Sequence, residues 1–195
     1  MPTPEFKAFE TKSPSQTLES PAHSLQHATE KPPSWGAYRE GVERAIAIAV
    51  HYHRGQRDKA GECYLLHLFR VMLSSSIPAV QQVGVLHDVL EDTAATPSVL
   101  MEAGLSNDII EAVILLTKPP EMPYTHYIVR LSKNLLAAEV KRNDLRDNYS
   151  IGRVAYRAEA TAEDAMRIQR YVLAHQFLSG IFDEPTFLAR MSGLE

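Results

Sequence analysis

Hydrophobic residues recur along most of this chain with the period of an α-helix. From Val42, apolar side chains fall at positions 42, 45, 46, 49 and 50, which is the repeat of an amphipathic helix. Similar patterns, bounded by glycine, proline and helix-starting polar residues, predict further helices over residues 64–73, 78–90, from 97, 107–116, 124–132, 134–148 and 161–178. No segment shows the apolar–polar alternation of a strand. The sequence therefore predicts an all-α fold, a compact bundle of short helices around one core.

The first 34 residues differ from the remainder in composition. They contain six of the twelve prolines, no glycine, and many serine, threonine, glutamate and lysine residues. Such a segment buries too little apolar surface to offset the entropy that it would lose on ordering. We therefore predict a disordered N-terminal tail over residues 1–34 and one folded domain over residues 35–195.

The overall composition is that of an ordinary globular protein. Hydrophobic residues make up 45% of the chain, and the mean hydropathy is -0.21. The sequence has no secretory signal and no apolar run near the roughly 20 residues that span a bilayer. Its single cysteine excludes an internal disulfide, and its net charge of -4 disfavours nucleic-acid binding. We expect a cytoplasmic protein with neither a membrane nor a nucleic-acid partner; the sequence predicts no particular oligomeric state.

The first predicted helix directs one histidine toward the core. At 100° per residue, His53 lies about 20° from Val42, on the apolar face, whereas His51 lies on the opposite face. A single inward histidine is usually a core residue whose hydrogen bonds are satisfied. His53 alone therefore does not predict a functional site.

A cluster of ionisable residues follows in the segment VGVLHDVLEDT. His87 shares a helix face with apolar residues, and Asp88, Glu91 and Asp92 follow within two turns. Burying several carboxylates together is unfavourable unless a cation compensates their charge. The alternative is a solvated helix end, but the other inward polar residues favour a cation site.

The segment LLAAEVKRNDLRDNYS brings another carboxylate onto an apolar face. Leu136, Val140 and Asp144 are spaced four residues apart, which aligns them on one side of a helix. Asn148 continues the same line, whereas Asp147 lies off it and is predicted to be exposed. The Asp144 carboxylate therefore needs a partner inside the fold.

Four inward polar side chains thus come from three helices: His53, His87, Asp88 and Asp144. Two imidazoles and two carboxylates suit a divalent cation such as Mn²⁺, with Fe²⁺, Co²⁺ or Zn²⁺ as alternatives. Such an ion would acidify a water for attack on phosphorus. Glu91, near the ion but not needed as a ligand, would orient or deprotonate that water. These residues predict a metal-dependent phosphohydrolase.

A basic loop, HRGQRDKAG, follows the first helix. It carries Arg54, Arg57 and Lys59 beside the predicted metal site. Basic side chains in that position would bind the phosphates of a substrate. Simple solubility is the alternative explanation, most of all for Arg57.

Taken together, these motifs resemble the hydrolase domain of RelA/SpoT-type enzymes, and in particular the single-domain small alarmone hydrolases. The matching segments span about residues 40–150 and are, in order, HRGQRDKAG, CYLLHLFRVM, VLHDVLEDT, LTK and VKRNDLRDN. A lone His-Asp pair would be a weak signal, whereas this ordered set is specific.

The resemblance implies an all-helical HD domain with a metal, usually Mn²⁺, held by the four side chains identified above. It also implies that Glu91 and Asp92 serve hydrolysis, that Lys59 lies by the phosphates with Arg54 near it, and that Asn148 helps to hold the nucleotide. The implied reaction removes pyrophosphate from the ribose 3′ position of (p)ppGpp.

Two departures from the family pattern leave the substrate open. Asp58 stands where many members have an arginine that stacks on guanine, so (p)ppApp or another nucleotide is an alternative substrate. The segment around His67 lacks its usual prolines, and His67 is expected to be structural, near the site rather than in it. A non-catalytic nucleotide-binding module is a further alternative, although a pure binder would not need Glu91 and Asp92.

Overall fold

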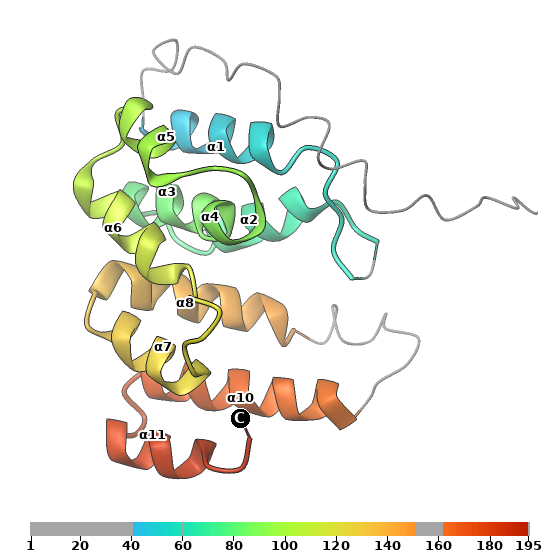
Figure 1. The fold of residues 1–195 in the computed structure, drawn as a ribbon, viewed down its shortest axis with the longest axis vertical. Helices are drawn as coiled ribbons and strands as arrows, with labels where there is room; N and C mark the ends of the chain where they lie inside the picture. The colour runs from blue at the N-terminus through green and yellow to red at the C-terminus, as the bar shows by residue number, and fades with distance from the viewer. Residues whose placement is uncertain (1–40, 60, 151–161, 195) are drawn as a thin grey trace, which may run out of the picture.

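The computed structural model describes residues 41–59, 61–150 and 162–194 as a bundle of helices (Figure 1). The helices are α1 (Gly41–Tyr52), α2 (Tyr64–Leu73), α3 (Pro78–Leu86), α4 (Val89–Asp92), α5 (Pro97–Glu102), α6 (Asn107–Leu116), α7 (Tyr124–Ser132), α8 (Leu135–Asn148), α10 (Ala162–Leu178) and α11 (Glu184–Met191). In the described residues one isolated bridge, between Arg57 and Cys63, is the only β pairing. The all-α prediction is confirmed. The predicted tail, residues 1–34, lies outside the described residues.

Helix α3 is the centre of the packing. It contacts α1, α2, α6 and α8, and its Val83 and Leu86 belong to the same buried apolar cluster as Ile48 of α1. A Cβ added to Gly84 would lie 3.1 Å from the Cα of Met72 in α2. Glycine therefore lets α3 pass close to α2, which brings the end of α3 near the polar residues of α2.

The predicted helix over residues 78–90 is interrupted at His87 and Asp88. Asp88 stays in the right-handed helical region but at its edge, with φ -102° and ψ -2°, and its carbonyl accepts from the amides of Glu91 and Asp92 to start α4. His87 Nδ1 donates to the carbonyl of Gly84 at a distance of 2.8 Å. The break matters for function because it places two adjacent ionisable residues at a turn rather than on a regular helix.

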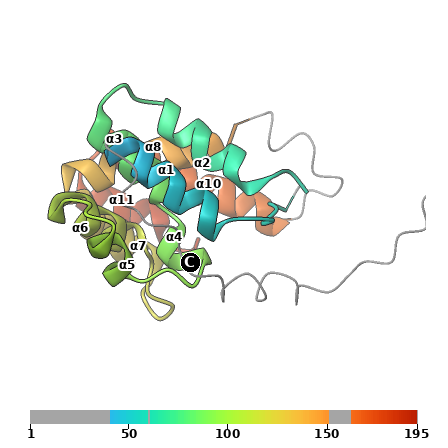
Figure 2. The same ribbon diagram turned by 90° about the horizontal axis from the view of Figure 1, so that it is seen from above.

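The C-terminal helices form a second layer. Helix α10 packs against α8, and α11 packs against α10 and α7; seen from above, α1, α2 and α3 cover α8 and α10 (Figure 2). The sequence analysis did not predict α11, whose start is fixed by the Asp183 carboxylate accepting from the amide of Thr186. None of the helices in the described residues combines the length and the apolar character needed to traverse a bilayer.

Candidate metal centre

His53 follows directly after α1 and is 1% exposed. Its Nδ1 donates to Oε1 of Gln56 at 2.5 Å, so the lone pair of the ring lies on Nε2. Within the described part of the chain, that buried Nε2 has no hydrogen-bond partner. Metal-ligating histidines have this arrangement, with one ring nitrogen donating to a fixed acceptor and the other turned toward the ion.

His87, at the break after α3, has the same arrangement. Its Nδ1 is occupied by the Gly84 carbonyl, and its buried Nε2 lies 3.0 Å from Oδ2 of Asp88 and 3.6 Å from Oδ1 of Asp144. Burial alone would lower the pKa of His87, but the charges of Asp88 and Asp144 outweigh it and raise this pKa well above the ordinary value. A lone pair facing two carboxylates would be repelled, so the site calls for a positive charge, either a proton or a cation.

Asp144 comes from the buried side of α8, as the spacing of residues predicted. Lys141 Nζ donates to its Oδ2 at 2.8 Å, and Asn148 Nδ2 donates to its Oδ1 at 2.5 Å. Although burial opposes the charged form, the charge of Lys141 and the bonds from His67 and His87 hold the pKa of Asp144 well below its usual range. Asp144 is therefore an ionised carboxylate in the protein interior.

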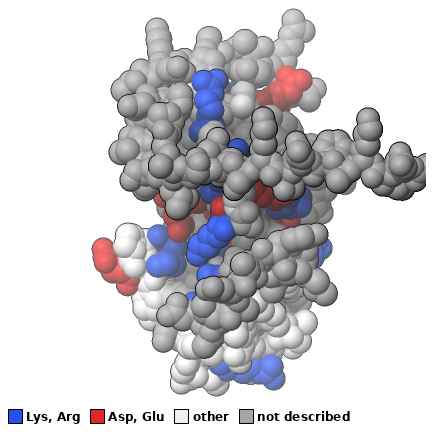
Figure 3. Space-filling view, turned by 90° about the vertical axis from the view of Figure 1, so that its right-hand side faces the viewer, with Lys and Arg blue, Asp and Glu red and all other residues white. Residues whose placement is uncertain are grey.

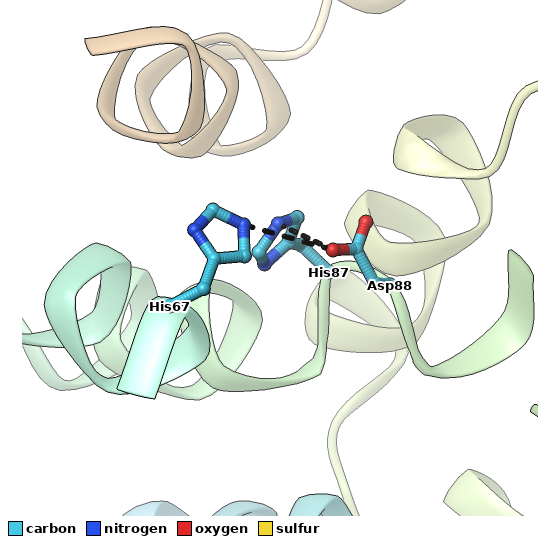
Figure 4. A group of neighbouring side chains, drawn as sticks. All are labelled: His67, His87 and Asp88. Atoms are coloured by element: carbon cyan, nitrogen blue, oxygen red, sulfur yellow. Dashed lines mark ion pairs between the residues drawn. The ribbon is translucent and has the colours of Figure 1, made fainter. Parts of the chain in front are cut away.

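His67 lies inside this cluster, although the sequence analysis expected it only near the site. Its Nδ1 donates to Oδ2 of Asp147 at 2.7 Å, and its Nε2 lies 3.3 Å from Oδ1 of Asp144. His67, His87 and Asp88 each offer a ligand atom within 4.8 Å of the others, and Figure 4 shows the three side chains turned toward one another. The helical spacing of His67 and the buried Val71, four residues apart on α2, is the signal that would have placed it inward.

Asp147 was predicted to be exposed, but its side chain is largely buried. Its side chain is 11% exposed and accepts hydrogen bonds from His67 and from Nε of Arg70, the latter at 2.7 Å. The prediction considered only the apolar line of α8 and not the polar residues of α2 that α8 meets. Asp147 thus fixes the orientation of the His67 ring and supports the cluster.

Glu91 and Asp92, on the short helix α4, lie at the exposed edge of the cluster. Glu91 Oε2 accepts from the backbone amide of Lys118 at 2.8 Å, and Asp92 Oδ2 accepts from the Tyr64 hydroxyl at 3.0 Å. Burial first, and the charge of Asp88 second, raise the pKa of both carboxyls, although the Lys118 amide partly offsets this for Glu91. A carboxylate with a raised pKa is better suited to accept a proton.

The residues predicted to bind substrate are spread around the cluster. Arg54 and Lys59 are exposed in the loop after α1, whereas Asn148 is bonded to Asp144. Arg57 Nη1 donates to the carbonyl of Gly61, and Asp58 Oδ1 accepts from the amide of Glu62 at 2.9 Å, so both side chains close this loop on itself. Charged side chains of both signs gather across the middle of the face where α1 and α8 end (Figure 3).

The donor set fits a divalent cation. It offers two inward imidazole nitrogens, Nε2 of His53 and of His87, and two carboxylates whose pKa values are lowered, Asp88 and Asp144. His53 and Asp144 lie outside the group of His67, His87 and Asp88 that meets within 4.8 Å. Asp144 is nevertheless 3.6 Å from Nε2 of His87, and His53 stacks on Tyr64, with ring centroids 5.3 Å apart, and interacts electrostatically with Asp88. Nitrogen and oxygen ligands of this kind suit Mn²⁺, Fe²⁺, Co²⁺ or Zn²⁺.

Comparisons with known proteins agree with this fold. No protein-family model matches the chain. Over 56 residues the chain is 39% identical to the GTP pyrophosphokinase of Streptomyces coelicolor, a segment that covers 27% of this chain and only 7% of that protein.

A solved structure gives the broader match. It is that of a metazoan ortholog of SpoT, which hydrolyzes ppGpp; the TM-score is 0.58 with 20% identity, and the match covers 81% of this chain and 99% of that one. The chain therefore has the helical fold of a SpoT-type hydrolase, and the resemblance to RelA/SpoT-type HD domains that its motifs indicated is confirmed at the level of the fold.

Proposed function

We propose that this protein is a metal-dependent phosphohydrolase that removes pyrophosphate from the ribose 3′ position of an alarmone nucleotide, (p)ppGpp or (p)ppApp. The observation that carries the proposal is the close approach of Nε2 of buried His87 to two ionised carboxylates, those of half-buried Asp88 and buried Asp144. The shared fold with a SpoT ortholog that hydrolyzes ppGpp supports the choice of substrate class.

In this proposal His53, His87, Asp88 and Asp144 hold one divalent cation, which we take to be Mn²⁺. When bound, such an ion supplies Lewis acidity and makes water a stronger acid. The chain prepares for it by occupying Nδ1 of both histidines, through Gln56 and Gly84, so that each Nε2 is turned inward and a cation can take the place of a proton there.

Glu91 is the proposed proton acceptor. The Lys118 amide bonds to Oε2, which leaves Oε1 to take a proton from the attacking water. The raised pKa of Glu91, caused first by burial and second by Asp88, makes the carboxylate a stronger base than in free solution. Asp92, held by Tyr64, is the second proposed hydrolytic carboxylate.

Arg54, Lys59 and Asn148 are the proposed contacts to the nucleotide. The two basic residues are exposed in the loop that follows His53 and would attract phosphates from solution. Asn148 Nδ2 carries two hydrogens and donates one of them to Asp144. The other can be donated to a ligand.

Asp58 bears on the base preference. Asp58 is bonded within its own loop and offers neither the plane nor the charge of the arginine that it replaces. An HD phosphohydrolase acting on another nucleotide is therefore the second candidate function.

One assay separates these possibilities. The purified protein is incubated with Mn²⁺ and, in parallel, with ppGpp, ppApp, GTP and ATP, and the products are separated. Release of pyrophosphate from ppGpp or ppApp is the expected result. Turnover of GTP or ATP alone would favour the second candidate, and no turnover with any divalent metal would favour a binding module.

A further inference from the structure

Tyr64 contacts three side chains of the proposed site, His53, Asp88 and Asp92, and has been given no role so far. It is the first residue of α2, and its amide donates to the carbonyl of Gln56 at 3.0 Å. The side chain of the same Gln56 accepts from His53. Gln56 thus fixes Tyr64 and His53 together, and their rings stack with an interplanar angle of 23°.

The Tyr64 hydroxyl lies between two carboxylates. It is 2.6 Å from Oδ2 of Asp88 and 3.0 Å from Oδ2 of Asp92. A phenol carries one hydrogen and can donate to only one of these oxygens at a time. The shorter distance indicates that Asp88 receives this hydrogen bond when no cation competes for its charge.

We propose that Tyr64 is a positioning residue that couples cation binding at Asp88 to the placement of Asp92. With a cation bound at Asp88, the Tyr64 hydroxyl would donate to Asp92 instead and would hold that carboxylate in place for hydrolysis. The inference rests on the proposed function, because it requires a cation at Asp88 and a hydrolytic role for Asp92.

The alternative is that Tyr64 only packs on His53. Tyr64→Phe separates the two roles, since it keeps the ring that stacks and removes the hydroxyl. If Tyr64 couples the carboxylates, Tyr64→Phe lowers kcat by about ten- to a hundredfold with little change in KM, the usual range for loss of a supporting hydrogen bond at a metal site. If the ring alone matters, kcat stays at the wild-type value.

A second readout does not depend on turnover. Mn²⁺ affinity is measured by isothermal titration calorimetry for wild type, Tyr64→Phe, Asp92→Asn and the double variant. With Asp92→Asn the neutral amide oxygen is a weaker acceptor than a carboxylate, so the hydroxyl favours Asp88 and competes with the ion, and we expect affinity to fall about tenfold. In the Tyr64→Phe background the same substitution is expected to cost about threefold or less, the part due to lost charge alone.

The controls separate this inference from the proposed function. Tyr52→Phe, on α1, removes a hydroxyl from a ring that contacts His51 and is expected to leave turnover unchanged. Thermal melting checks that each variant folds. Wild-type protein that neither binds Mn²⁺ nor hydrolyses ppGpp or ppApp would overturn the proposed function and this inference with it. A wild type that does both, with an additive affinity cycle and unchanged kcat in Tyr64→Phe, would overturn the role of Tyr64 alone.

Discussion

Two neighbouring regions carry the proposed chemistry, and they differ in burial and in how their charges are satisfied. In the proposed metal centre, His53, His87 and Asp144 are at most 3% exposed, and Nε2 of His87 lies 3.6 Å from Oδ1 of Asp144, which comes from another helix. In the loop after α1, residues 54–59, side chains are exposed or half-exposed; Arg57 donates to the carbonyl of Gly61, and Asp58 accepts from the amide of Glu62.

The contrast shows which part of the site is constrained. Charges buried together depend on one another, because removing one leaves its partner unpaired in a medium of low dielectric. Charges in an exposed loop are screened by solvent, so each can change with little effect on the others. We therefore expect cation binding to respond sharply to substitution and substrate preference to respond gradually.

The largest effect is expected from Asp144→Asn. The substitution removes the charge that Lys141, His67 and His87 face, and it leaves Lys141 as a buried ammonium with no anionic partner at its 2.8 Å contact. We expect Mn²⁺ binding to be lost and the free energy of unfolding to fall by about 3–5 kcal/mol, the usual cost of breaking a buried ion pair. Calorimetry with Mn²⁺ and urea unfolding measure the two effects.

Asp108→Asn is the matched control, since Asp108 is exposed in the first turn of α6. It should change stability by no more than about 0.5 kcal/mol. Asp144→Asn protein that bound Mn²⁺ as tightly as wild type would show that the buried cluster is an ion-pair network and not a metal centre.

The second-largest effect is expected on turnover and not on cation binding. Glu91→Gln keeps an acceptor for the Lys118 amide but removes the basic oxygen. We expect kcat to fall about 10²- to 10⁴-fold, the usual contribution of a general base, while Mn²⁺ affinity is retained. Single-turnover hydrolysis of ppGpp and Mn²⁺ titration measure the two, with Glu111→Gln on the exposed face of α6 as the control. Wild-type turnover in Glu91→Gln would remove the proton-accepting role.

A smaller effect is expected in the exposed loop. Arg54→Ala and Lys59→Ala each remove a positive charge near the proposed phosphate position. We expect KM to rise about tenfold, with kcat nearly unchanged, and the effect to shrink as salt is raised. Steady-state kinetics at two ionic strengths test this against Lys133→Ala, which removes an exposed lysine after α7. A fall in kcat with KM unchanged would contradict a role limited to attraction of substrate.

The smallest effect is expected from Asp58→Asn. The amide oxygen still accepts from the Glu62 amide, so the loop keeps its shape while it loses one negative charge. We expect KM for ppGpp and ppApp to fall together by about two- to threefold, because weaker repulsion acts on phosphates and not on the base. A change confined to one of the two nucleotides would instead place Asp58 beside the base. Glu184→Gln, exposed at the start of α11, is the control.

The sequence by itself determined most of the helices and three inward polar residues. Hydrophobic periodicity located most helices within a few residues, because a helix that buries one face must repeat its apolar positions every 3.6 residues. The same periodicity predicted that His53, His87 and Asp144 point inward, and the structure buries all three. Motif order then indicated the fold that the SpoT ortholog shares.

Only the tertiary structure decided which inward faces meet. Periodicity tells which side of a helix is buried but not what lies opposite, so the sequence missed the places of His67 and Tyr64 beside Asp88 and the burial of Asp147. The break at His87 was missed as well, because the apolar pattern runs through it while the Gly84 carbonyl bonds to the imidazole. The contacts of His67, Tyr64 and Asp147 join residues 21 to 80 positions apart, and such distances in sequence are bridged only when the helices pack.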